Sequence, residues 1–221
     1  MRRISLALVT AAALSVGPAL AADEPNEPPI ANPTQMIDSV TVENISELAK
    51  ELGGQSIETR EFNGRKTVIM MDGEVPYNLG LAICDMRPGK CVILLAFVLM
   101  DFGDTNYPLE VVNSLNRDGW FLTMAKTGEK NIMSFGRAII VDGGVTKKNL
   151  AINMGAFVGA FRETMKNLKT QLVAGVYPSG AQLKAQMSEP TFRPVVPQPE
   201  EAARIMDKMA EAYRAASKQA R

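Results

Sequence analysis

The segment 92–100 most constrains what this chain can fold into, because it contains no polar residue. Successive side chains of a β-strand point to opposite faces of a sheet, and an antiparallel sheet with one wet face alternates apolar and polar residues. A strand of this composition is apolar on both faces. We therefore expect both faces to be covered, by helices of the same chain, by its C-terminal segment, by a second copy or by a bound partner.

The two cysteines of the chain, Cys84 and Cys91, flank a six-residue turn between two apolar runs. We expect them to form a disulfide that closes a hairpin. In that register paired residue numbers sum to 175, so Ala82 lies opposite Ile93 and Leu81 lies opposite Leu94. One face would then carry Cys84, Ala82, Gly80, Cys91, Ile93, Leu95 and Phe97. The other would carry Ile83, Leu81, Leu79, Tyr77, Val92, Leu94 and Val98.

The first residues of the chain have the pattern of a secretion signal. Arg2 and Arg3 precede an apolar run over 4–16, and a small-x-small motif ends at Ala21. We expect a signal peptide over 1–21 with cleavage between Ala21 and Ala22. No later stretch reaches about 18 uninterrupted apolar residues, so no integral membrane segment is expected after cleavage. The predicted location is periplasmic or secreted, where disulfides persist.

The composition argues against several classes of function. Loss of Arg2 and Arg3 leaves two fewer basic than acidic residues, which is no electrostatic footprint for nucleic acid. The chain has no histidine, the usual general base at neutral pH, and its serines and carboxylates show no partnered arrangement. The cysteine spacing fits neither a zinc site nor a redox motif. We expect no catalytic residue, no metal site and no cofactor.

Periodicity and turn residues predict the element order. After a flexible leader over 22–38, we expect a helix over 41–52 and strands over 55–62, 66–71, 75–84 and 91–100. A short helix over 108–116, strands over 120–126 and 131–141, and a long helix from Thr146 to near Gly175 follow. This order indicates an α+β domain over 39–175, built on an antiparallel meander with flanking helices. A proline-rich linker over 176–199 leads to a C-terminal helix or tail over 200–221.

Two further patterns have competing interpretations. Gly155 and Gly159 form a small-xxx-small pair, a pattern that also occurs where membrane helices dimerise; here we expect it to allow close packing of the long helix on the sheet. Among the thirteen methionines, several fall on predicted strands and could line an adaptable ligand cavity or fill the core: Met70, Met71, Met100, Met124 and Met133.

Three segments in a fixed order resemble the YbjN family, whose members are described as putative bacterial sensory transduction regulators. They are Ile83-Cys84 through Gly89-Lys90-Cys91, Val112-Asn113-Ser114-Leu115-Asn116-Arg117 with Phe121 beyond it, and Asp142-Gly143-Gly144-Val145-Thr146 before a long helix. The resemblance covers about 39–172. It implies a fold like that of type III secretion chaperones, a non-catalytic role in regulation or protein binding, and no established cofactor.

Together these observations predict an exported, non-enzymatic, chaperone-like binding or regulatory module. We expect it to engage a protein or peptide partner, or a second copy of itself, through an apolar face of the sheet. A periplasmic small-molecule binder is the alternative.

Overall fold

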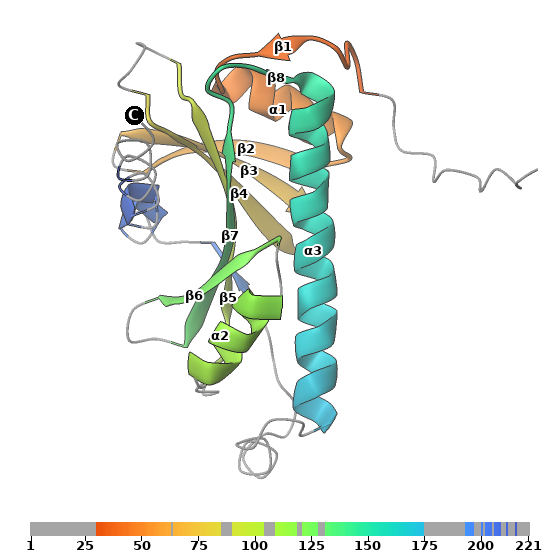
Figure 1. Cartoon of the computed structure of the whole chain (residues 1–221), viewed down its shortest axis with the longest axis vertical. Coiled ribbons are helices and arrows are strands. Elements are labelled where there is room, and N and C mark those ends of the chain that lie inside the picture. Colours follow the sequence, from red (N-terminus) through yellow and green to blue (C-terminus); the bar gives the residue numbers. More distant parts are fainter. Residues whose placement is uncertain are drawn as a thin grey trace, which may run out of the picture.

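The computed structural model of this protein (Figure 1) describes residues 30–62, 64–84, 90–103, 109–118, 121–127, 131–174 and 193–196, with 200, 202–204, 206–208, 211 and 215. The predicted signal peptide, the cleavage site at Ala21 and Ala22, and the residues between the cysteines, 85–89, lie outside the described residues.

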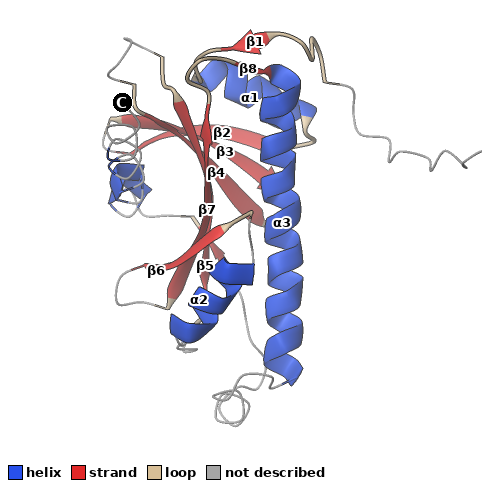
Figure 2. Ribbon diagram, in the orientation of Figure 1, coloured by secondary structure: helices blue, strands red, loops and turns tan. Residues whose placement is uncertain are grey.

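A seven-stranded antiparallel sheet forms the centre of the molecule (Figure 2). Its strands are β2 (Ser56–Phe62), β3 (Arg65–Asp72), β4 (Val75–Ala82), β5 (Ile93–Asp101), β6 (Thr123–Thr127), β7 (Ile132–Ile140) and β9 (Arg193–Val195). The order is β2-β3-β4-β5-β7-β6, and β9 pairs with β5. Strand β7 lies beside β5 and places β6 at the edge, so the second half of the sheet departs from a simple meander. The predicted α+β class is confirmed.

Helices α1 (Val42–Glu51) and α3 (Lys147–Ala174) pack on one face of the sheet, and α2 (Leu109–Asp118) packs beside β6. Thr41 caps α1 as predicted, because its side chain accepts from the Asn44 amide while the Asn44 side chain accepts from the Thr41 amide. Thr146 likewise accepts from the Asn149 amide at the start of α3. The capped ends explain why both helices begin where the sequence predicted.

Aromatic rings fill the space between α3 and the sheet. Phe161 lies edge-on to Tyr77 and to Phe135, with ring centroids 5.7 Å and 5.3 Å apart. Phe157 makes a similar contact with Tyr77. The Tyr77 hydroxyl is buried and makes no hydrogen bond of good geometry within the described residues, although the Arg162 guanidinium lies close enough to interact with it. Burial, and then the charge of Asp72, raise the pKa of Tyr77 to about 12, so the phenol stays neutral at physiological pH.

A buried lysine links the two helices on this face. Lys147, at the start of α3, is 4% exposed and donates to Glu47 and Glu51 on α1, each at 2.8 Å. Burial alone would lower the pKa of Lys147, but the two carboxylates outweigh it and raise the pKa. The ammonium group therefore keeps its charge and joins α3 to α1.

The predicted register of the cysteine hairpin is confirmed. Ala82 pairs with Ile93 and Leu81 pairs with Leu94. The alternation of faces is correct from Tyr77 to Ala82 and from Ile93 to Val98, since Leu79, Leu81 and Leu94 pack toward the helices while Ile93, Leu95 and Phe97 pack on the opposite face.

The face assignment fails at the closed end of the hairpin. Cys84 and Cys91 pack toward the helices, and Ile83 and Val92 pack on the opposite face, the reverse of the prediction. The cause is local on each strand. Strand β4 ends at Ala82, and Ile83 has a φ of +54°, which shifts the alternation by one place; on the other strand the chain bends at Val92, before β5 begins at Ile93. Cys91 then pairs with Val40, just before α1.

Two segments predicted to be irregular contain short strands. Within 22–38, β1 (Met36–Ile37) pairs with β8 (Val145–Thr146), and Ile37 is buried. Within 176–199, β9 pairs with β5. Neither segment has a periodic pattern of its own. Each becomes ordered because it forms a few backbone hydrogen bonds with a strand that is distant in the sequence.

Candidate partner-binding face

The sheet face opposite α1 and α3 is the candidate site, and we call it the arm face. It carries Phe62, Ala82, Ile83, Val92, Ile93, Leu95, Phe97, Leu99 and Ile132, each less than 9% exposed. Among the described residues, Val195, Ala202 and Met206 near the C-terminus pack on it. We call β9 and the described helical residues at 200–215 the C-terminal arm. In Figure 1 the helical residues of the arm lie on the left of the sheet and α3 lies on the right.

The helical part of the arm buries small side chains and one long one. Ala202 and Met206 are fully buried, and Ala203 is 2% exposed, while Arg204, Asp207 and Lys208 are exposed. Ala202 and Met206 belong to the same apolar cluster as Phe97. The spacing of four residues between them places both on one side of a helix. The arm therefore meets the sheet along a narrow apolar stripe.

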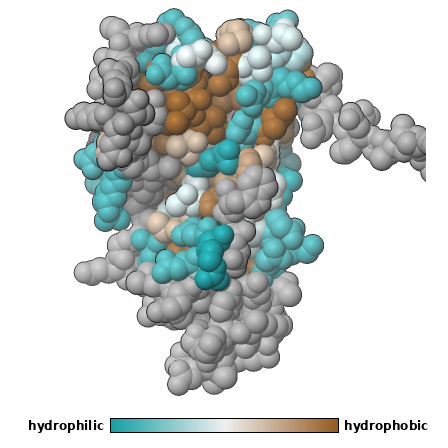
Figure 3. All heavy atoms as spheres, viewed as in Figure 1, coloured by the Kyte–Doolittle hydropathy of each residue, from teal (hydrophilic) through white to brown (hydrophobic). Residues whose placement is uncertain are grey.

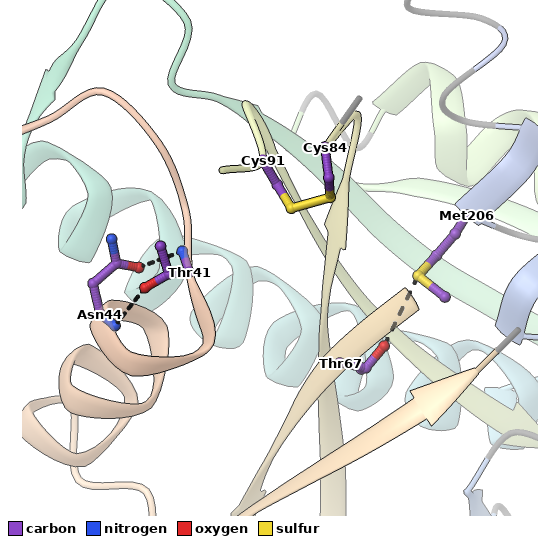
Figure 4. The surroundings of a disulfide bond; sticks show 6 residues. All are labelled: Thr41, Asn44, Thr67, Cys84, Cys91 and Met206. Atoms are coloured by element: carbon purple, nitrogen blue, oxygen red, sulfur yellow. Dashed lines mark hydrogen bonds between the residues drawn. A yellow bond between two sulfur atoms is a disulfide. The ribbon is translucent and has the colours of Figure 1, made fainter. Parts of the chain in front are cut away.

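Met206 occupies a slot above Gly80 of β4. A Cβ atom built on Gly80 would lie 2.6 Å from the Met206 sulfur, closer than real Cβ contacts. The Thr67 hydroxyl on β3 also points at this sulfur, at 3.9 Å (Figure 4). The absence of a side chain at Gly80 thus lets an unbranched side chain lie flat against the sheet.

The residue after Met206 makes a charged contact with the sheet. Asp207 forms an ion pair with Arg65, the first residue of β3. The pair is partly exposed, so it adds little stability, about 0 to 1 kcal/mol. Its contribution is orientation, because it sets which side of the helical turn faces β3.

Strand β9 attaches the other end of the arm. Leu99 pairs with Val195, Met100 with Pro194 and Asp101 with Arg193. These β5 residues have no pairing with β4, whose ladder with β5 begins at Asn78 and Phe97. Asn78, fully buried at this point, donates to the Phe97 carbonyl at 3.4 Å. The separation of β4 from β5 therefore leaves an open strand edge, which β9 fills.

The described contacts hold the arm with modest energy. Burial of one methionine and two alanines contributes on the order of 3 kcal/mol, and β9 adds three residue pairs. A free energy of a few kcal/mol leaves a minor population, roughly 0.1 to 10%, in which the arm is released.

The arm leaves part of the apolar sheet in contact with solvent. Ile140 on β7 lies opposite the buried Ile93, yet is 46% exposed, and Val196 after β9 is 38% exposed. Figure 3 shows hydrophobic residues gathered over the upper part of the sheet on the side toward the viewer. The sheet thus offers apolar surface next to the arm.

The predicted disulfide between Cys84 and Cys91 is present, with Cα atoms 3.9 Å apart (Figure 4). It borders a cavity of about 540 Å³ whose walls include Thr41 and Val42 of the α1 start, Arg65 and Lys66 of β3, and Ile83. The bond therefore holds the hairpin end at which the chain reverses its faces.

Replacement of Cys84 and Cys91 by serine is expected to lower the free energy of unfolding by about 2.5 kcal/mol, the entropic cost of closing so short a loop. Urea titrations of the oxidised wild type and the double variant measure the difference. Addition of a reductant should lower the stability of the wild type and leave the variant unchanged. Equal stability of wild type and variant would contradict a structural role for the bond.

The methionines named in the sequence analysis do not line one common ligand cavity. Met124 and Met133 are buried in the core under the helices, while Met70 and Met100 line separate cavities of about 550 and 480 Å³. Met71 is half-buried in β3.

The expectation that Gly155 and Gly159 pack on the sheet is wrong: both are exposed, and a Cβ on either would meet nothing within 4 Å. Both instead line the cavity of about 550 Å³ that Met70 also borders.

Within the described ranges, no group of three or more histidine, cysteine or acidic residues lies close enough to hold a metal ion. No helix in the same part of the chain combines the length and apolarity needed to cross a membrane. No family model, no curated protein and no solved structure matches this chain.

Proposed function

We propose that this protein is an exported, non-enzymatic binding module that engages a protein or peptide partner through the arm face. The observation that carries the proposal is the arm itself: a segment distant in sequence occupies this face as a bound peptide would. Its extended part adds to an open strand edge of β5, and its helical part inserts Met206 above Gly80. Strand addition with side-chain pockets is a recurring mode of peptide recognition.

Sequence and structure also support the setting of this function. The disulfide between Cys84 and Cys91 is compatible with an oxidising compartment, and the N-terminal pattern predicts export to the periplasm or beyond. Membership of the YbjN family, with its regulatory and chaperone-like expectation, is part of the same proposal. The motifs around the two cysteines and before α3 support it.

Photo-crosslinking tests whether the arm face meets a partner. A photoreactive phenylalanine analogue replaces Ile140, which borders the arm face and is 46% exposed, in the full-length protein mixed with periplasmic extract. The matched control carries the analogue at Ile152, 55% exposed on α3. We expect a defined adduct from position 140 that is absent from position 152. Equal adducts from both positions, or none from position 140, would count against the proposal.

A small-molecule binder is the second candidate, and the cavity beside the disulfide favours it. The cavity combines apolar walls from Leu81 and Ile83 with the cationic side chains of Arg65 and Lys66. The carboxylate residue Glu43 also lines it, so the two cations outnumber one acidic group. Such a lining suits a small apolar acid, because cations bind carboxylates and the walls exclude water. Saturable binding of a fatty acid to the wild type, weakened by Lys66→Ala, would support this candidate; absence of binding would remove it.

A further inference from the structure

The C-terminal arm covers the surface that the proposed function assigns to a partner, and this bears on what the partner must look like. We infer that the arm is a built-in competitor, and that the partner is a peptide segment of the same chemistry: a short extended strand followed by a helical turn carrying small residues and a methionine-like side chain. This inference rests on the proposed function and deepens it.

The strand position of the partner follows from β5. Its residues Leu99 to Asp101 offer backbone groups to one extended segment of about three residues. The middle position is Pro194 in the arm, which has no N–H and is tolerated at the edge of a sheet. A partner segment must therefore be extended here, and backbone pairing gives it affinity with little demand on sequence.

The helical part supplies the selectivity. Ala202 belongs to the apolar cluster of the face and is fully buried, so a larger side chain there would lift the helix from the sheet. The slot above Gly80, flanked by Thr67, admits the unbranched Met206 and excludes a side chain branched at Cβ. Arg65 favours an acidic residue directly after the methionine, as Asp207 in the arm.

Competition follows from covalent attachment. The arm is joined to α3 by an 18-residue segment, 175–192, which keeps it at an effective concentration in the millimolar range near the face. A partner in solution binds only the minor population whose arm is released, so its apparent Kd is weakened in proportion to that population, by about 100-fold for a released fraction of about 1%.

The test cuts the covalent link between the arm and the rest of the chain while the arm stays in the sample. A site-specific protease site is inserted within 176–192 of the full-length protein, and a fluorescein-labelled peptide of residues 193–215 is titrated into intact and cleaved samples. We expect the labelled peptide to bind the cleaved protein with a Kd at least tenfold lower than the intact protein. A peptide with Met206→Asp should lose binding, and one with Lys208→Asp should bind as the unchanged peptide does.

Equal affinity for intact and cleaved protein, or binding that survives Met206→Asp in the peptide, would overturn the inference. Failure of the cleaved protein to exchange its arm, together with a defined crosslink from position 140, would overturn the competition while leaving the proposed function standing. Exchange of the arm without any crosslinked partner would count against the proposed function alone.

Discussion

Replacement of Phe161 by alanine is expected to lower the free energy of unfolding by about 3 to 5 kcal/mol, the largest effect we predict for a single change. The ring is 2% exposed and lies edge-on between Tyr77 and Phe135, so its loss leaves a cavity at the centre of the contact between α3 and the sheet. Both neighbours are rigid aromatic residues that cannot collapse into the space. Denaturant titrations followed by circular dichroism measure the change.

The control for this substitution lies on the same helix. Ile152 is 55% exposed, so Ile152→Ala removes apolar atoms from the surface and should change stability by less than about 0.5 kcal/mol. A similar loss in the two variants would show that α3 is oriented differently from the description given above.

Replacement of Met206 by aspartate is expected to lower the free energy of unfolding by about 3 kcal/mol, because a charge cannot remain in the fully buried slot above Gly80. The cost has an upper limit. The arm can detach while the sheet and the helices stay folded, so the loss cannot exceed the free energy with which the arm docks. Thermal and denaturant unfolding, with a hydrophobic dye to report the uncovered face, measure both consequences.

Lys208→Asp is the matched control, since it introduces the same carboxylate two residues further along an exposed position of the same segment. It should change stability by less than about 0.5 kcal/mol and leave dye binding unchanged. An unchanged stability for Met206→Asp would mean that the arm does not cover the sheet.

The sequence predicted the hairpin of β4 and β5 residue by residue because one covalent constraint fixed its register. A disulfide between Cys84 and Cys91 allows a single pairing sum, and the side-chain period of two then assigns each face. The same rule failed one residue beyond Ala82, since a positive φ is rare for a β-branched residue such as Ile83 and no turn signal announces it.

The sequence did not predict which segment covers the arm face, and the reason is physical. Strand β9 contains a proline and only three residues, and its order comes from the unpaired edge of β5 and not from a propensity of its own. Ala202 and Ala203 look unremarkable in a polar segment although both are buried, and the place of Met206 depends on the absence of a side chain at Gly80. The apolar content of 92–100 nevertheless required that some cover exist.

Gly155 and Gly159 show the limit of a local pattern. Their spacing of four residues places them on one side of α3 but does not say which side faces the sheet. The larger apolar residues of α3, Leu150, Met154, Phe157 and Phe161, take the buried side because they remove more apolar area from water. The glycines are consequently left on an exposed part of the helix.

Nuclear Overhauser contacts from the Met206 methyl group test the central claim most directly. In full-length protein with labelled methionine methyl groups, we expect contacts from the Met206 methyl to the α-protons of Gly80, to the ring of Phe97 and to Thr67. A Met206 methyl signal with the sharp line of a solvent-exposed side chain, and with no contact to these three residues, would contradict the account of the arm face.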